Sequence, residues 1–324
     1  MPPGSKRCFG RYVVVDWSAA SVPAPRRPRP DTIWSAELSW SDARPDTRYH
    51  RTRAAAAAHL LARLRAAAGR GERVLIGFDF PYGYPRGFAA RLAHGAAAPD
   101  LPPWRRTWQV LCAVVKDDPG NRSNRFEAAR WLNAQVGGSR CGPFWGCPAA
   151  EARAGLDTRS PGFPYRTGDG SCLTRLRRCE ARLPGTQESW KLFYAGSAGS
   201  QALTGIPRVH GLRFDPHLER CSRVWPFETG FTGTPTPEQG PAVIHAEMWP
   251  TLADARARTL LASQPQGEQR ALIRDEAQVW ALSEWARNLD ADGVLGDLFA
   301  RPAGLEPPEV DDIIAEEGWV LGAR

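Results

Sequence analysis

Four acidic residues stand at positions where a packed core would exclude a charge. Asp16 closes the β-branched run RYVVVD, Asp79 closes RVLIGFD, and Glu247 closes PAVIHAE. Asp275 falls on the apolar stripe of a predicted helix. Burying an isolated ionised carboxylate is costly, so each of these acids needs a partner or a cation. Gathered in one cleft, they would offer the hard oxygen ligands that Mg²⁺ or Mn²⁺ requires, and paired metals support phosphoryl displacement.

A structural explanation of these acids stays open beside the chemical one. Asp16 precedes WSAA and Asp79 precedes FPYG, and both segments are typical of turns. Taken singly, each acid is explained as a turn or cap residue. Taken together, in this order along the chain, the acids favour a shared site.

The elements expected between the first two acids should bring them together. The run ending at Asp16 and the segment 32–40 predict strands, and a short third strand is expected near 45–50. The Ala- and Leu-rich segment 51–71 predicts a helix ending in a glycine cap, before the strand that stops on Asp79. Because strand–helix–strand crossovers are right-handed, we expect the two acid-ending strands to be adjacent and parallel, with 32–40 antiparallel beside the first.

A later helix is predicted over 268–290. Asp275 occupies a gap in its apolar stripe, whereas Glu276 is expected to point elsewhere. A carboxylate on the buried face requires pairing, capping or a metal. The stripe consists of Leu272, Val279, Leu282, Ala286 and Leu289.

Regularity falls between residues 86 and 240, where turn-forming residues are frequent. Helices are expected across 123–133 and near 171–183. Trp, Phe and Leu recur throughout, which indicates a packed insertion and not a flexible linker. The expected organisation is a core of 1–90 and 240–324, with an insertion, 91–239, packed on it.

The order of these features resembles the ribonuclease H-like superfamily. The segments SNRFEAARWLN, GPFWGCP and SAGSQALTGIP are similar to motifs in its DUF429-type branch of predicted nucleases. The resemblance implies an α/β fold, a ribonuclease H-like mixed sheet flanked by helices, with Asp16, Asp79 and Asp275 as metal ligands. Glu247 departs from the commonest placement of a ligand in that superfamily. Some relatives carry labels that link them to molybdopterin guanine dinucleotide synthesis.

A glycine/serine turn in SWKLFYAGSAGSQALTGIP is a candidate phosphate site. It opens a helix with backbone N–H groups at Ser197, Ser200 and Gln201, and Lys191 lies nearby in the sequence. A tight turn in which glycine permits positive φ explains the same residues, and the Walker A order is absent. Arg125 is a further candidate for orienting a substrate, although a helix cap just before it accounts for much of its segment.

Composition sets limits on partners and location. The 324 residues carry a formal net charge of +7, supplied mostly by arginine because Lys6, Lys116 and Lys191 are the only lysines. Such arginine use is also typical of GC-rich genomes, so it favours an anionic partner only weakly. Seven irregularly spaced cysteines and the lack of a secretory or long apolar segment predict a cytoplasmic protein without membrane contact. Zinc-knuckle spacing and the G-x-S-x-G motif of serine hydrolases are absent.

We therefore expect a divalent-metal-dependent phosphoryl hydrolase acting on a phosphodiester in nucleic acid or a nucleotide. Asp16, Asp79, Asp275 and, less centrally, Glu247 would be catalytic, and Lys191 would hold phosphate. One alternative is an enzyme acting on a small nucleotide or pterin cofactor, with the aromatic insertion roofing a closed pocket. Another is a non-catalytic nucleotide or nucleic-acid binding protein. The sequence leaves the oligomeric state open.

Overall fold

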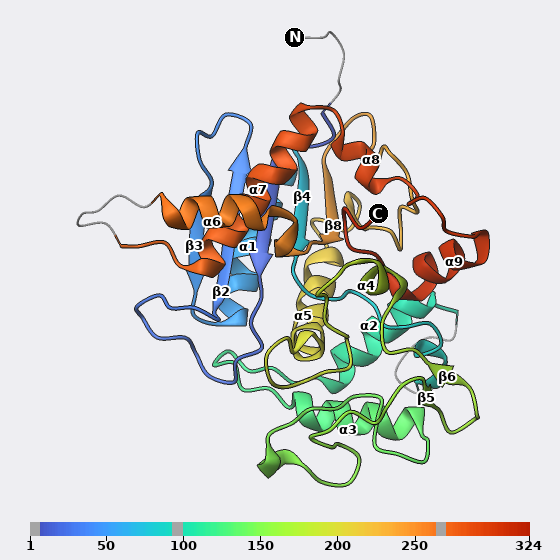
Figure 1. The fold of residues 1–324 in the computed structure, drawn as a ribbon. Helices are drawn as coiled ribbons and strands as arrows, with labels where there is room; N and C mark the ends of the chain where they lie inside the picture. Colours follow the sequence, from blue (N-terminus) through green and yellow to red (C-terminus); the bar gives the residue numbers. More distant parts are fainter. Residues whose placement is uncertain (1–6, 93–99, 264–269) are drawn as a thin grey trace. The chain divides into compact units, whose positions relative to one another are not determined.

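The computed structural model describes residues 7–92, 100–263 and 270–324 (Figure 1). The chain forms two compact units. The predicted insertion 91–239 contributes to both units, because its residues 212–239 belong to the first unit and most of its remaining residues to the second. The sheet unit comprises Met1–Asp79, Pro119–Asn121 and Leu212–Arg301, and the helical unit comprises Phe80–Asp118, Arg122–Gly211 and Pro302–Arg324.

A six-stranded mixed sheet of order β3-β2-β1-β4-β8-β7 forms the centre of the sheet unit. The first three strands form an antiparallel meander, and β1, β4, β8 and β7 run parallel to one another. The expected α/β class, a mixed sheet flanked by helices, is confirmed. The strands are β1 (Arg11–Asp16), β2 (Ile33–Ser39), β3 (Asp46–His50), β4 (Arg73–Phe78), β7 (Ser222–Val224) and β8 (Ala242–Glu247).

The pairing predicted for the two acid-ending strands is also confirmed. β1 and β4 are adjacent and parallel with Val15 beside Phe78, and β2 lies antiparallel on the other side of β1. Asp16 and Asp79 each directly follow one residue of this pair, so the two acids lie at the same end of the parallel strands. Near-continuous apolar runs in the parallel strands suit burial on both faces.

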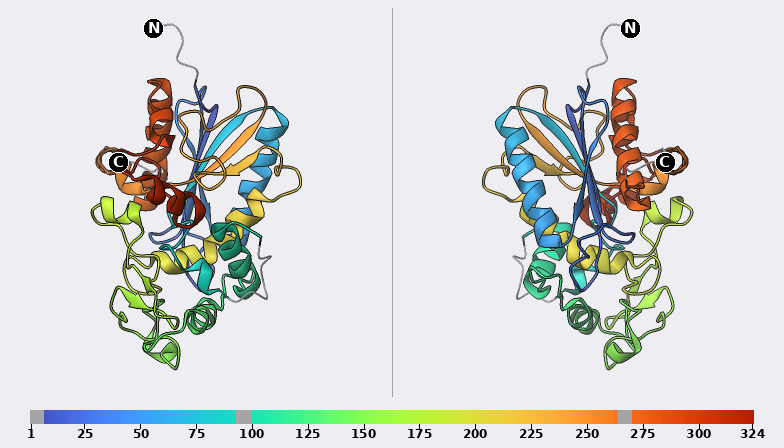
Figure 2. Two further views of the ribbon diagram at one scale, coloured as in Figure 1. Left: turned by 90° about the vertical axis from the view of Figure 1, so that its right-hand side faces the viewer. Right: turned by 90° about the vertical axis from the view of Figure 1, so that its left-hand side faces the viewer.

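Helices cover both faces of this sheet. Figure 2 shows α1 (Arg53–Gly69) and α7 (Arg274–Ala291) on opposite sides of it. α1 connects β3 to β4 and begins at Thr52, whose side chain accepts a hydrogen bond from the Ala55 N–H. Gly71, just past its end, has φ +74°, which agrees with the predicted glycine cap. The remaining helical segments of this unit are η3 (Pro250–Ala253), α6 (Asp254–Ala262) and α8 (Leu295–Phe299).

The predicted helix 268–290 begins later than expected, at Arg274. Glu268 and Gln269 lie outside the described residues, and Leu272 precedes the helix. Asp275 is therefore in the first helical turn. Glu276, expected to point elsewhere than Asp275, lines a polar cleft, yet it is 4% exposed and its carboxylate accepts hydrogen bonds from Thr47 and Arg270.

The helical unit is built around an aromatic core. Tyr84, Phe88, Phe144 and Trp190 are all buried, with ring centroids 4.8 to 5.7 Å apart. These rings serve packing, because each is covered by its neighbours. A helix appears where 123–133 predicted one, whereas the helix expected near 171–183 is only five residues long.

The unit contains α2 (Pro103–Val114), α3 (Arg125–Val136), α4 (Arg178–Arg182), α5 (Ala198–Arg213) and α9 (Pro307–Asp312), the short turns η1 (Ala89–Arg91), η2 (Ala149–Glu151) and η4 (Ile313–Glu317), and the ribbon β5 (Tyr165–Arg166) and β6 (Cys172–Leu173).

Candidate functional site

The acid pair at the strand ends is held by the backbone of β1. Asp16 is the last residue of β1, and Asp79 directly follows β4. The Trp17 N–H donates to Asp79 Oδ1 at 2.8 Å. Asp16 and Asp79 lie close enough for the charge of Asp79 to raise the pKa of Asp16. Parallel pairing thus brings the two carboxyl groups together, as the sequence predicts.

A third carboxyl group reaches the pair from α7. Asp275, in the first turn of α7, is 6% exposed, and its Oδ2 accepts from the Thr32 N–H at 3.2 Å. The residue before β2 therefore helps to orient the acid on the helix. Asp275 is close enough to Asp16 and Asp79 for its charge to shift both of their pKa values.

The pKa of each of these three carboxyl groups is raised. Burial raises the pKa of Asp16 well above its usual value, and the charges of Asp79 and Asp275 add to the effect. Burial likewise raises the pKa of Asp79 to about 7, although the Trp17 N–H opposes the shift. The pKa of Asp275 rises for the same leading reason. We call Asp16, Asp79 and Asp275 the carboxylate cluster.

Apolar side chains behind the pair explain why burial dominates these shifts. A gap of about 180 Å³ beside Asp16 and Asp79 is too narrow for water and is lined largely by apolar groups. A carboxylate facing such a wall loses hydration that its neighbours do not replace, which favours the protonated form. The apolar lining includes Val14, Met248, Pro250, Val279 and Leu282.

The fit of the carboxylate cluster to a divalent cation depends on the spacing of its side chains and on their donor chemistry. Within the described residues, no three His, Cys, Asp or Glu side chains are already grouped tightly enough to hold an ion. The donor chemistry nevertheless fits magnesium, which is commonly bound by one or two carboxylates and several waters. Asp16 and Asp79 supply such a pair, and the strongest influences on Asp16 include no basic side chain that would take the place of a cation.

Asp31 is a member of this neighbourhood that the sequence analysis missed. It is exposed, has φ +59°, and its charge raises the pKa of both Asp16 and Asp275. Aspartate tolerates this left-handed conformation better than most residues. The signal in the sequence is an aspartate directly before the predicted strand 32–40, a common place for a turn.

Glu247 does not join the cluster. It is 5% exposed and pairs with Phe78, which itself pairs with Val15. Paired residues of a parallel sheet present their side chains to the same face, and successive residues alternate. The side chain of Glu247 is therefore on the face of Val15 and Phe78, opposite that of Asp16.

The predicted phosphate turn belongs to the helical unit, and its donors are occupied within the turn. Lys191 Nζ donates to the Ala195 carbonyl at 2.6 Å, and Ser200 Oγ donates to the Leu192 carbonyl at 2.6 Å. The N–H groups of Ser200 and Gln201 both point to the Ser197 carbonyl, at 3.1 and 3.4 Å. These contacts agree with the tight-turn explanation that the sequence left open.

Glycine and arginine near this turn also have structural roles. A Cβ on Gly199 would lie 2.5 Å from the Ser189 carbonyl oxygen, so only glycine fits there. Arg125 is 7% exposed, its guanidinium lies 4.5 Å from the centre of the Phe126 ring, and it donates to Ser123 Oγ at 3.3 Å. Its burial at the start of α3 suits a positioning role in the fold.

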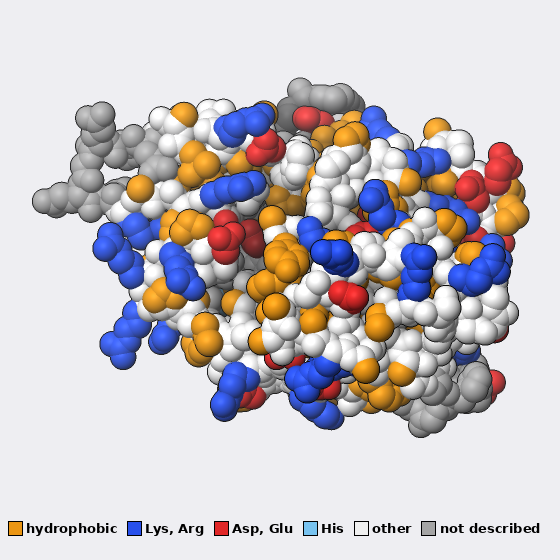
Figure 3. Space-filling view, turned by 60° about the horizontal axis from the view of Figure 1, so that its bottom comes forward, with side chains coloured by type: hydrophobic (Ala, Val, Ile, Leu, Met, Phe, Trp, Pro, Cys, Tyr) orange, Lys and Arg blue, Asp and Glu red, His pale blue; other side chains and the backbone are white. Residues whose placement is uncertain are grey.

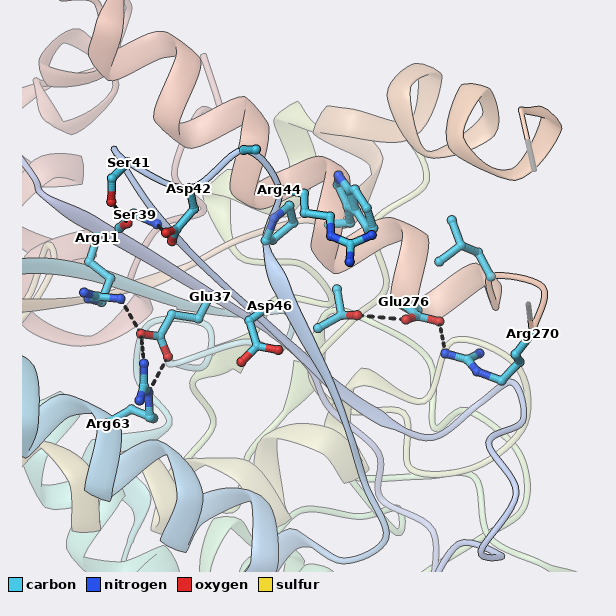
Figure 4. A pocket seen from close by; sticks show the side chains of 15 residues that line it. Arg11, Glu37, Ser39, Ser41, Asp42, Arg44, Asp46, Arg63, Arg270 and Glu276 are labelled. Carbon is cyan, nitrogen blue, oxygen red and sulfur yellow. Dashed lines mark hydrogen bonds and ion pairs between the residues drawn. The ribbon is translucent and has the colours of Figure 1, made fainter. Parts of the chain in front are cut away.

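A polar cleft of about 940 Å³ lies at the β2–β3 end of the sheet. Figure 4 shows two bonded groups among its charged side chains: Glu37 lies between Arg11 and Arg63, and Glu276 lies beside Arg270. Because these charges are satisfied within the cleft, it offers less for an ionic ligand than the carboxylate cluster does.

Comparison with known proteins gives no relative: no family model, curated protein or solved structure matches the chain. In the described ranges, no helix has both the length and the apolar character needed to cross a membrane. All seven cysteines are described, and none of them forms a disulfide bond. Because no relative is found, the functional proposal depends on the residues of the sheet unit alone.

Proposed function

We propose that the chain is a divalent-metal-dependent phosphoryl hydrolase of ribonuclease H-like fold, acting on a phosphodiester in nucleic acid or a nucleotide. The observation that carries the proposal is the carboxylate cluster. Three acids from the end of β1, the end of β4 and the start of α7 lie close together at buried or half-buried positions, where Asp275 raises the pKa of both Asp16 and Asp79, and Asp79 raises that of Asp16. Such an arrangement costs stability, and it is explained if a cation is the missing partner.

The arrangement of the strands supports the fold part of the proposal. The two central parallel strands, the antiparallel meander beside them and the acid-bearing helix occur in the order that the resemblance to predicted DUF429-type nucleases implies. Acids at the carboxyl ends of neighbouring parallel strands occupy the usual location of sites in open α/β sheets.

The chain's own groups would prepare the site before any ligand arrives. The Trp17 N–H holds Asp79, and the Thr32 N–H holds Asp275, so the carboxylates are fixed by backbone atoms of the sheet unit. Asp16 and Asp79 would hold Mg²⁺ or Mn²⁺, and Asp275 would complete the negative charge around it. Such a cation, when bound, neutralises charge on the phosphoryl oxygens and activates water.

Calorimetric titration with Mn²⁺ tests this proposal directly. Asp16→Asn and Asp79→Asn preserve size but remove a charge, so each should weaken Mn²⁺ binding by roughly ten- to a hundredfold. Glu247→Gln is the matched control, because this buried acid lies on the opposite face of the sheet and should leave Mn²⁺ affinity unchanged.

Thermal melts in EDTA separate metal binding from folding. Removing one carboxylate of the pair should leave the metal-free protein as stable as wild type or more stable, since repulsion and desolvation are relieved. Equal Mn²⁺ affinity in wild type and both Asp variants would defeat the proposal. Loss of affinity together with a large loss of metal-free stability would show that the acids serve the fold.

A further inference from the structure

The loop between β1 and β2 exposes three arginines with no ionic partner. Basic and acidic side chains are interspersed over the face drawn in Figure 3, so binding of an anion would depend on local clusters. Arg26, Arg27 and Arg29 form one: all three are exposed, and in the described part of the chain their side chains make no hydrogen bond or ion pair. We call residues 18–31 the arginine loop; it lies at the lower left of Figure 1.

Several other arginines of the sheet unit are held by acids. Arg65 is bonded to Asp215, and Arg256 to Glu284. The same holds for Arg11 and Arg270 of the polar cleft. The three guanidinium groups of the arginine loop are thus an unneutralised charge in a unit whose basic groups are often paired.

The backbone of the arginine loop is fastened to the sheet unit through its carbonyl groups. Ala24 exchanges two hydrogen bonds with Arg51, at 2.7 and 2.8 Å. The Tyr49 hydroxyl donates to the Pro25 carbonyl at 2.9 Å. Buried Arg53 donates to the carbonyls of Ser18 and Ala20, at 3.1 and 2.8 Å.

Proline stiffens the same segment. Pro23, Pro25, Pro28 and Pro30 alternate with the arginines and fix φ at four positions. A loop with a restrained backbone loses less conformational entropy when its side chains engage a ligand. The arginines are therefore presented in a largely prepared arrangement.

Both ends of the arginine loop adjoin the carboxylate cluster. The loop starts two residues after Asp16, and it ends at Asp31, directly before Thr32, whose N–H donates to Asp275 Oδ2 at 3.2 Å. A polymer with phosphates spaced along its length can reach both features at once, one phosphodiester at the acids and neighbouring phosphates at the arginines. A mononucleotide has too few phosphates to do so.

We propose that the arginine loop binds the sugar–phosphate backbone of a nucleic acid and makes a polynucleotide the substrate of the carboxylate cluster. Arginine is suited to this task because its planar guanidinium bonds phosphate oxygens in pairs. The loop carries Val22 as its one large exposed aliphatic side chain, which is too little apolar surface to anchor a membrane. The substrate assignment rests on the proposed hydrolase function, whereas nucleic-acid binding by the loop does not.

Fluorescence anisotropy with a labelled 20-nucleotide single-stranded DNA, in EDTA and at several salt concentrations, tests the loop without any metal. The double variant R26Q/R27Q should bind about tenfold more weakly at low salt. For this variant, the slope of log K against log salt concentration should become shallower by about 1.4, because roughly 0.7 is lost per phosphate contact. The sequence of the oligonucleotide should not matter, because phosphate contacts carry no base information.

The matched control is R220Q/R223Q, which removes the same charge near β7, at the end of the sheet opposite β3. This double variant should retain wild-type affinity and salt dependence. Equal losses in the two double variants, or absence of salt-dependent binding in wild type, would overturn the proposal. So would binding of both to anionic vesicles but not to DNA, or complete competition by inorganic phosphate at micromolar concentration.

Failure of the hydrolase proposal gives a different pattern. If Mn²⁺ titration detects no site while R26Q/R27Q still weakens DNA binding selectively, the arginine loop is a nucleic-acid surface and the carboxylate cluster is not a metal centre. If Mn²⁺ binds and both double variants bind DNA like wild type, the metal centre stands and the arginine loop is not its substrate-binding arm.

Discussion

Two groups of buried or half-buried acids in the sheet unit are accommodated in opposite ways. In the polar cleft, burial raises the pKa of Glu37, but hydrogen bonds and charges from Arg63 and Arg11 outweigh it and hold the pKa below its usual value. In the carboxylate cluster, burial raises the pKa of Asp16, and neighbouring acids raise it further. The first group is neutralised by the chain itself, and the second is left to bind a proton or a cation.

Two adjacent residues of α7 show the same contrast between an acid paired with arginine and an acid without such a pair. Asp275 and Glu276 are both buried in the first helical turn, where the helix dipole favours acids. Glu276 is paired with Arg270, 2.7 Å away. Asp275 is instead held by the Thr32 N–H beside other carboxyl groups. Burial alone therefore does not mark a functional acid; the choice of partner does.

The largest effect is expected when Asp275 and Glu276 are substituted separately and the hydrolytic activities of the two variants are compared. Asp275→Asn should lower hydrolysis of bis(4-nitrophenyl) phosphate with Mn²⁺ by roughly a hundredfold, because it removes charge from the proposed metal centre. Glu276→Gln should stay within about threefold of wild type once folding is verified. Similar losses in both variants would show that α7 acts here only through its packing. The measurement is the steady-state rate at saturating Mn²⁺.

Next in size is an effect on stability in the polar cleft. Glu37→Gln removes the shared partner of Arg11 and Arg63, so it should lower the free energy of unfolding by about 2 kcal/mol. Arg63→Gln should cost less, because 44% of its side chain is exposed and solvent already screens the pair. Urea unfolding in EDTA measures both values. A larger loss for Arg63→Gln would contradict the ranking.

A smaller effect concerns the pH dependence of stability without metal. The pKa of Asp79 rises from 3.8 to about 7 on folding, so the folded state holds this proton more tightly than the unfolded state. The stabilising contribution is therefore complete below about pH 4 and is lost as the pH rises toward 7. Wild type in EDTA should lose stability over this range, and Asp79→Asn should flatten the slope. An unchanged slope in the variant would assign the titration to other groups.

The smallest effect is expected at the glycine/serine turn of the helical unit. Lys191→Gln should change affinity for single-stranded DNA by less than about twofold, because the ammonium group already donates to the Ala195 carbonyl. The same anisotropy assay checks it beside R26Q/R27Q. A loss as large as that of the double variant would restore this turn as a phosphate site.

Several features of the site follow from the sequence with little help from tertiary structure. β-branched runs, the Ala- and Leu-rich crossover helix and the preferred hand of crossovers together predict that Asp16 and Asp79 end adjacent parallel strands. Asp275 was marked by its conflict with an apolar stripe. Each of these signals is local, or depends on a connection rule that tolerates little variation.

Only the tertiary structure decides which of the remaining acids and bases have partners. The register of β8 turns Glu247 to the face opposite Asp16, and a shift of one residue would reverse this. The pairing of Glu276 with Arg270, and of Glu37 with two arginines, joins groups from different elements. The sequence shows which side chains can carry a charge, whereas the energy of that charge depends on the atoms that surround it after folding, and these come from distant parts of the chain.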